Sequence, residues 1–157
     1  MSVPHEDHVR LLAGVGSRGH PVYELVPAVA VEPGVYEVLG TPALAFGCAA
    51  GDRVRVAEDG TFDIVARGGN IAVVIFPREP VGDGDLAELS AGLDELGGLA
   101  EAPDDGCLVV VTVPVSATFS AIESTVEGWA RRFDAEWSFA NVYDKDDQPI
   151  NWWSPTT

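Results

Sequence analysis

Residues 71–76 read Ile-Ala-Val-Val-Ile-Phe, an unbroken apolar run within a chain of 157 residues. Such a run, bounded by turn residues, is typical of a central strand that is covered on at least one face. The patterns that follow it predict the order strand, helix, strand, strand, helix, strand, ending with a strand over residues 136–143. This order indicates a ferredoxin-like split βαβ arrangement, in which two helices lie on one face of a four-stranded antiparallel sheet.

Apolar side chains spaced three or four residues apart predict the two helices. The first helix begins near Asp85 and Glu88, which suit a capping pair, and carries Leu86, Leu89, Leu93 and Leu96. Gly97-Gly98 is expected to end this helix, because glycine readily adopts the left-handed backbone conformation found at helix C-termini. The second helix carries one stripe, formed by Phe119, Ile122, Val126, Trp129 and Phe133. Between the helices, the turn at residues 103–106 predicts an antiparallel hairpin of residues 99–102 and 107–113.

The stretch before residue 70 contains short strand patterns separated by turn residues, which predicts a small curved sheet or barrel. The candidate strands are residues 9–15, 22–31, 35–39, 53–57 and 62–66. Residues 41–50 are apolar but contain Pro42 and Gly47, so they predict a short turn of helix or a packed loop. The fold class is therefore α+β.

The composition changes along the chain predict three parts that form one compact unit. A barrel-like half covers residues 1–69, a ferredoxin-like half covers residues 70–143, and an acidic tail with two tryptophans covers residues 144–157. The seam between the halves lies at Gly68-Gly69, which is too short a link for independent domain motion.

The charge of the chain restricts its partners. Lysine and arginine number 9 and aspartate and glutamate number 25, so the formal net charge is −16. This excess repels phosphate backbones and anionic membrane surfaces, so we expect neither nucleic-acid nor membrane binding. The first residues lack a basic start with an apolar stretch, and no apolar run reaches the length of a membrane span. A cytoplasmic location is expected.

Three short motifs lie between residues 42 and 70. They read Pro-Ala-Leu-Ala-Phe-Gly from Pro42, Gly-Asp-Arg-Val from Gly51, and Arg-Gly-Gly-Asn from Arg67. These segments resemble a bacterial family of unknown function, whose members carry a Pro-x-x-Ala-aromatic-Gly segment, a Gly-Asp-x-Val and a later Arg-Ser-Gly before a strand. The resemblance covers residues 8 to about 140 and implies a fold without an activity. Gly68 stands where the family usually has serine, and the family's tryptophan near the second strand is absent around Glu24.

The motifs also suggest a candidate ligand site. Asp52 can accept backbone N–H groups in a turn, and Arg67 near a strand end can pair with it. Fixing a turn is one interpretation of these residues. The other is a small anion or polar ligand held by Asp52, Arg67 and Asn70, in a pocket where the two halves of the chain join. A two-glycine run without a full phosphate-binding motif is weak evidence for phosphate binding. No cofactor is expected.

The end of the chain combines acidic side chains with two large aromatic ones. Asp144, Asp146 and Asp147 precede Trp152 and Trp153. Tryptophan flanked by carboxylates is typical of a contact surface for a basic protein. Alternatively, both rings fold back to cover an open edge of the sheet or the mouth of the barrel.

Metal binding and catalysis find little support in the sequence. The cluster at residues 5–8, His-Glu-Asp-His, lies in a terminus that we expect to fray, and the calcium-loop pattern that starts at Asp144 has Pro149 where glycine is needed. Cys48 and Cys107 are interpreted as small buried hydrophobic residues. A catalytic triad assembled only by folding stays open, but nothing in the sequence points to an enzyme.

These observations together favour a non-catalytic acidic protein that recognises a basic protein partner. The most concrete form is an immunity protein that neutralises a bacterial toxin made beside it, since a negative surface accelerates association with a cationic partner. The alternative is a small-ligand-binding or regulatory domain with its pocket near the turn from Arg67 to Asn70.

Overall fold

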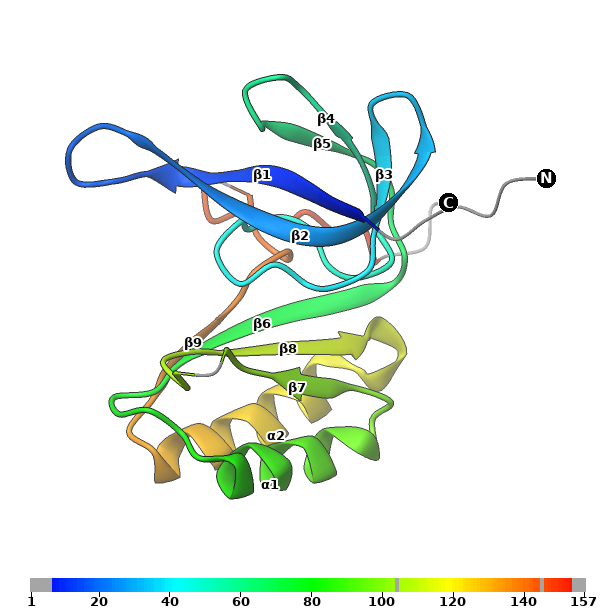
Figure 1. Ribbon diagram of the computed structural model, residues 1–157. Coiled ribbons are helices and arrows are strands. Elements are labelled where there is room, and N and C mark those ends of the chain that lie inside the picture. Colours follow the sequence, from blue (N-terminus) through cyan, green and yellow to red (C-terminus); the bar gives the residue numbers. More distant parts are fainter. Residues whose placement is uncertain (1–6, 104, 145, 154–157) are drawn as a thin grey trace. The chain divides into compact units, whose positions relative to one another are not determined.

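The computed structural model describes residues 7–103, 105–144 and 146–153. The chain divides into two compact units, Met1–Gly69 and Asn70–Thr157, which we call the N-terminal unit and the C-terminal unit (Figure 1). Each unit has its own antiparallel sheet and its own apolar core, and both helices belong to the C-terminal unit. The prediction of an α+β fold is confirmed.

The N-terminal unit is a five-stranded meander in which each strand pairs with the next. Its strands are β1 (Asp7–Val15), β2 (Pro21–Glu32), β3 (Val35–Val38), β4 (Arg53–Val56) and β5 (Phe62–Ala66). Along these strands, every second side chain points into the core, as expected for a sheet with one buried face. The buried residues of this core are Val9, Leu11, Val26, Ala28, Val38, Ala45, Cys48 and Val54.

This sheet is open, so the barrel alternative is wrong and the curved sheet is confirmed. The strand order leaves β1 and β5 at opposite edges. One backbone hydrogen bond of 2.8 Å, from the Leu12 N–H to the Gly60 carbonyl, joins β1 to the turn before β5 without forming a ladder. Residues 41–50 form the packed loop rather than a helix, and Ala45 and Cys48 of this loop are buried.

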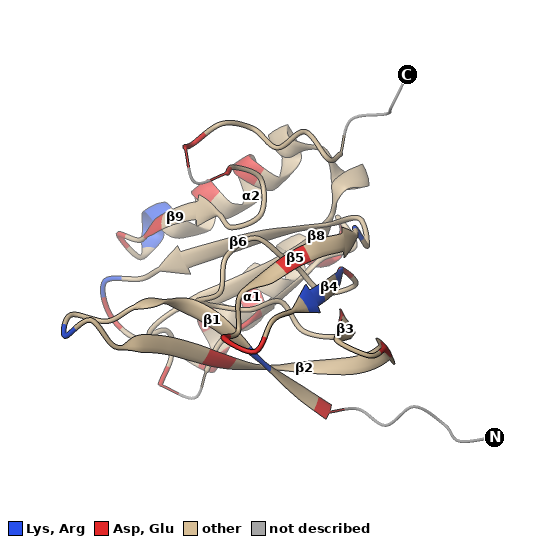
Figure 2. Ribbon diagram, turned by 90° about the horizontal axis from the view of Figure 1, so that it is seen from above, with Lys and Arg blue, Asp and Glu red and all other residues tan. Residues whose placement is uncertain are grey.

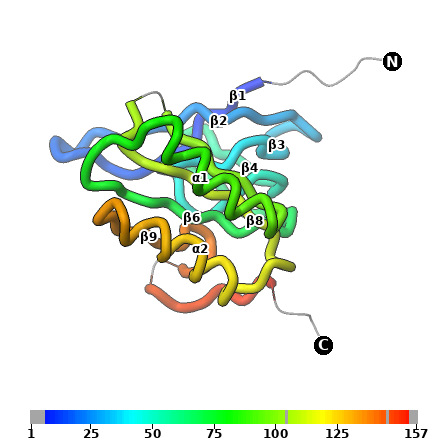
Figure 3. Tube along the Cα trace, turned by 90° about the horizontal axis from the view of Figure 1, so that it is seen from below, coloured from blue at the N-terminus to red at the C-terminus, as the bar shows by residue number. Residues whose placement is uncertain are grey.

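The C-terminal unit has the predicted ferredoxin-like topology. Its elements are β6 (Asn70–Phe76), α1 (Asp83–Asp94), β7 (Leu99–Glu101), β8 (Val109–Pro114), a short 3-10 helix (Val115–Ala117), α2 (Phe119–Arg132) and β9 (Glu136–Phe139). The sheet order is β7-β8-β6-β9, with antiparallel pairing throughout. Both helices lie side by side on one face of this sheet (Figure 3).

The core of the C-terminal unit lies between its sheet and its helices. Alternate residues of β6, namely Ile71, Val73 and Ile75, are fully buried in this core. They pack with the predicted apolar positions of the helices, which include Leu89, Leu93, Ile122, Val126 and Trp129. Because burying one large apolar side chain contributes about 1.5–3 kcal/mol, this layer is the main source of stability for the unit. Among the described residues, no helix has the length and apolar character needed to cross a membrane.

Two local features differ from the sequence prediction. Helix α1 begins at Asp83, two residues before the expected capping pair, and its cap is Gly82, which makes no side-chain bond. Strand β8 begins at Val109 rather than at residue 107, because the Cys107 N–H donates to the Asp105 carboxylate at 3.0 Å within a turn. Cys107 is consequently exposed, so its predicted burial is wrong, while Cys48 is buried as expected.

Strand β9 ends at Phe139 instead of Tyr143. Beyond it, the side chain of Asn141 makes hydrogen bonds to β6 in place of the backbone. Fully buried Asn141 accepts a hydrogen bond from the Ala72 N–H and donates one to the Asn70 carbonyl, both at 2.9 Å. Its amide thus pairs with β6 as another strand residue would. The Asn141 carbonyl accepts a 2.9 Å bond from the indole N–H of Trp152, which attaches the end of the chain to the sheet.

Replacement of Asn141 by alanine should destabilise the C-terminal unit, because the buried Ala72 N–H then loses its partner. The expected loss is about 1–3 kcal/mol in urea unfolding followed by tryptophan fluorescence. The control is Ser138→Ala at an exposed position of β9, which should change the unfolding free energy by less than about 0.5 kcal/mol. Equal effects of the two substitutions would show that the Asn141 side-chain amide does not stabilise the end of β9 against β6.

Candidate functional site

The loop between β3 and β4, residues 39–52, contains two of the family-like motifs. Asp52 is fully buried and accepts the N–H groups of Gly68 at 2.8 Å and Ala49 at 2.9 Å. The Arg67 guanidinium lies 3.3 Å from the Asp52 carboxylate and donates to the Gly47 carbonyl at 2.9 Å. Asp52 and Arg67 therefore meet as predicted, and their hydrogen bonds hold the end of this loop.

Burial raises the pKa of the Asp52 carboxyl above its usual value, although the bonds from Gly68, Ala49 and Arg67 act in the opposite direction. A carboxyl whose pKa is raised on folding contributes stability that is lost as the pH rises through its folded pKa. Asn70, the third residue of the proposed ligand site, begins β6 in the other unit, where its carbonyl accepts from Asn141.

Glu24 on β2 holds the other end of the same loop, a role that the sequence analysis missed. Its carboxylate accepts three successive backbone N–H groups, from Ala43 at 2.8 Å, Leu44 at 2.8 Å and Ala45 at 2.9 Å. Three N–H donors on one carboxylate form a charge-assisted arrangement that resembles an anion-binding nest. The loop is therefore fixed at both ends by carboxylates from outside its own apolar segment.

Gly68 occupies a position where a side chain has no room. A Cβ atom built there would lie 2.4 Å from the carbonyl carbon of Gly51, well inside van der Waals contact. Glycine is thus required by the close approach of two backbones in this chain. Serine or any other side chain at this position would need the Gly51 turn to move.

The two thiols differ in exposure but share a raised pKa. Burial, followed by the nearby Asp52 carboxylate, raises the pKa of the Cys48 thiol to about 12. Desolvation and the adjacent Asp105 also raise the pKa of Cys107. Because the thiolate is the reactive form, a raised pKa disfavours that form of both thiols at neutral pH.

The acidic segment near the end of the chain forms a tight turn. Asp144 accepts the N–H groups of Asp146 at 2.8 Å and Gln148 at 3.0 Å, and Asp146 and Asp147 are exposed. Tyr143 and Pro149 form a bridge that closes this turn. The three carboxylates are therefore displayed on a short hairpin-like loop of the C-terminal unit.

Trp152 and Trp153 are half-buried and pack on the core of the C-terminal unit. The ring of Trp153 meets Phe119 edge to face at 5.1 Å, and the two indole rings lie 5.7 Å apart. Both rings therefore fold back onto the core of their own unit. The assignment of Trp152, Trp153 and the three aspartates of the turn to a partner-binding surface stays a prediction.

The histidine cluster lies partly outside the described residues, since these exclude His5 and Glu6. His8 and His20 are exposed. Within the described part of the chain, no group of three or more histidine, cysteine or acidic side chains is placed to hold a metal ion.

The negative charge is concentrated in the C-terminal unit. The N-terminal unit has 9 acidic and 5 basic residues, a net charge of −4, whereas the C-terminal unit has 16 and 4, a net charge of −12. All three arginines of the C-terminal unit already form ion pairs, which are Arg78 with Asp134, Arg131 with Glu127, and Arg132 with Glu88. Its fourth basic residue, Lys145, lies outside the described residues. Figure 2 shows acidic positions along α2 and basic positions near its end.

Substitution of Glu24 by glutamine should release the apolar loop, because the amide nitrogen of glutamine would face backbone donors. We expect a loss of about 1–3 kcal/mol in unfolding free energy and faster hydrogen exchange at Ala43, Leu44 and Ala45. Glu37→Gln, which removes a partly exposed ion pair on β3, is the control and should leave this exchange unchanged. Unaltered protection in the Glu24 variant would refute the anchoring role.

Glu127 provides a pH-sensitive marker on the helix face. Its carboxylate accepts the indole N–H of Trp137 at 2.6 Å and pairs with Arg131, and these contacts lower its pKa below the usual 4.5. The stability they contribute is present at neutral pH and is lost as the pH falls through that lowered pKa. The Trp137 indole N–H resonance should therefore titrate with a midpoint below 4.5. The titration should disappear in Glu127→Gln, and a midpoint at or above the usual value would contradict the structure.

Comparison with known proteins identifies a family and a fold. No curated protein matches the chain. Among solved structures, one described as "Novel crystal structure of a hypothetical protein from Neisseria gonorrhoeae" is similar, with a TM-score of 0.67 and 15% sequence identity over 88% of this chain and 96% of that one. At this identity the likeness shows the fold alone. The profile of a family described as "Domain of unknown function (DUF4265)" matches residues 24–138, and the chain belongs to this family.

Proposed function

We propose that this protein is a non-catalytic binding protein whose acidic C-terminal unit recognises a basic protein partner. In its most concrete form it is an immunity protein that neutralises a bacterial toxin made beside it, and a cytoplasmic location is part of this proposal. The observation that supports it best is the net charge of −12 on the C-terminal unit, whose three arginines are already paired.

Two parts of this unit offer clustered carboxylates to such a partner, the turn of Asp144, Asp146 and Asp147 beside Trp152 and Trp153, and helix α1. Helix α1 carries Asp83, Asp85, Glu88 and Asp94 and contains no basic residue. Because neighbouring like charges create a potential that reaches beyond the surface, a cationic protein is drawn toward them and oriented before contact. Association of this kind is faster than that of neutral surfaces and is sensitive to salt.

A catalytic role receives less support from the two cysteines, since both have raised pKa values. The alternative of a ligand site near the Arg67–Asn70 turn ranks second. Both oxygens of Asp52 and one guanidinium nitrogen of Arg67 already bond to the protein itself, which favours the turn-fixing role for these two side chains.

The proposal can be tested with the purified products of the genes adjacent to the one that encodes this chain. We expect one basic product to bind with a dissociation constant in the nanomolar range by isothermal titration calorimetry. Its toxicity should be relieved when both proteins are expressed together. Lack of binding at micromolar concentration to every adjacent product would argue strongly against an immunity function.

Two charge variants should locate the binding surface. Asp94→Asn with Glu123→Gln removes one exposed carboxylate from each helix, and we expect the association rate to fall at least threefold because steering weakens. The matched control is Glu58→Gln with Asp63→Asn, which removes two exposed carboxylates from the N-terminal unit and should change the rate less than twofold. The reverse order of effects would place the surface on the N-terminal unit.

A further inference from the structure

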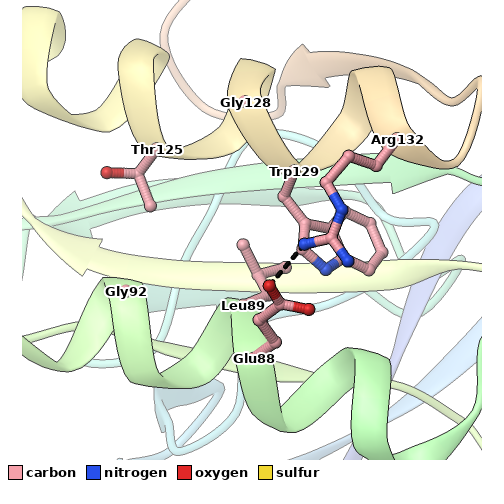
Figure 4. A pocket seen from close by; sticks show the side chains of 7 residues that line it. All are labelled: Glu88, Leu89, Gly92, Thr125, Gly128, Trp129 and Arg132. Atoms are coloured by element: carbon pink, nitrogen blue, oxygen red, sulfur yellow. Dashed lines mark hydrogen bonds and ion pairs between the residues drawn. The ribbon is translucent and has the colours of Figure 1, made fainter.

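A groove runs between the two helices of the C-terminal unit. It has a volume of about 180 Å³ and is lined by Glu88, Leu89, Gly92, Thr125, Gly128, Trp129 and Arg132 (Figure 4). Two glycines keep it open, one on each helix. A Cβ atom at Gly128 would meet nothing within 4 Å, and one at Gly92 would only touch Thr125 at 3.4 Å.

The walls of the groove combine a carboxylate with flat apolar surface. The indole N–H of Trp129 donates to the backbone carbonyl of Asp85 at 3.0 Å, so hydrogen bonding between the helices fixes the ring. Leu89 is buried beneath it. Apolar surface next to a carboxylate suits an arginine or lysine side chain. Its methylene groups can pack on the apolar surface while its charged group pairs with the carboxylate.

One cation of the chain itself already occupies this carboxylate. Arg132 reaches from α2 to Glu88 on α1, and both side chains are about half exposed, at 52% and 53%. The guanidinium of Arg132 also lies over the Phe133 ring, 5.5 Å from its centroid. Figure 4 shows this pair beside Trp129 at one end of the groove, with Gly92 and Gly128 further along. Exposed ion pairs of this kind are weak, so an incoming cation can exchange with Arg132.

We propose that this groove receives an arginine or lysine side chain of the basic partner, which replaces Arg132 as the cation bound to Glu88. The inference rests on the proposed function and deepens it, because it specifies where the partner's charge enters. Charge complementarity selects this occupant, since Glu88 is the carboxylate in the lining of the groove and α1 itself contains no basic residue. Arg132 thus acts as an internal substitute for the partner until the partner binds.

The test uses a hexa-arginine peptide as the probe, titrated into the full-length protein at about 150 mM salt, a condition that screens distant charges. Amide resonances of Gly92 and Gly128 should shift on binding. Arg132→Ala should bind the peptide at least threefold more tightly than the wild type, because Glu88 is then unoccupied. Arg131→Ala removes the same charge one residue away, from the pair with Glu127, and should change the affinity less than 1.5-fold.

A second pair of variants tests the groove independently of the higher affinity expected for Arg132→Ala. Glu88→Gln should weaken peptide binding at least fivefold. Gly128→Leu, which fills the groove without changing the charge, should do the same while circular dichroism and thermal unfolding confirm an intact fold. Equal effects of the two arginine substitutions, or wild-type affinity in Gly128→Leu, would overturn the inference. If the inference is overturned but a basic product of a neighbouring gene still binds the protein, the proposed function is unaffected. If no such product binds, the proposed function itself is refuted.

Discussion

The excess of carboxylates in the C-terminal unit is the constraint on which the functional account depends. Sixteen acidic residues face four basic ones in this unit, so the folded state carries a net charge of −12. Self-repulsion of this size opposes compaction, and the apolar layer between β6 and the two helices offsets it. The three arginine pairs relieve the repulsion only locally, because exposed ion pairs contribute little. The proposed binding of a basic partner would supply a cation from outside to this excess of carboxylates.

Carboxylates in the N-terminal unit have a different role. Glu24 and Asp52 both accept backbone N–H groups of the loop between β3 and β4, and Asp52 is fully buried. The three motifs between residues 42 and 70 lie on this loop and on the Arg67–Gly68 segment that packs against it, within the range matched by the family. In this chain they hold an apolar loop in one conformation.

Local pattern was sufficient to predict much of the C-terminal unit. The spacing of Leu89 and Leu93, the stripe ending at Trp129 and the turn after Pro103 each depend on neighbours a few residues away, and together they determine the ferredoxin-like order. Some errors were local, such as the burial of Cys107, whose turn is set by Asp105 two residues away. Other features were missed because contacts distant in the sequence decide them. Glu24 meets partners 19 to 21 residues away, and Asn141 ends β9 through partners 69 and 71 residues away. Likewise, Gly92 and Gly128 define a groove only once α1 and α2 lie side by side.

The salt dependence of association tests the central claim most directly. The rate constant for binding to the basic product of a neighbouring gene should be measured by stopped-flow fluorescence from about 20 to 500 mM salt, a range over which the Debye length falls several-fold. If the C-terminal unit recognises its partner through charge, the association rate should fall at least tenfold across this range while dissociation changes little. An association rate that does not respond to salt would contradict the account.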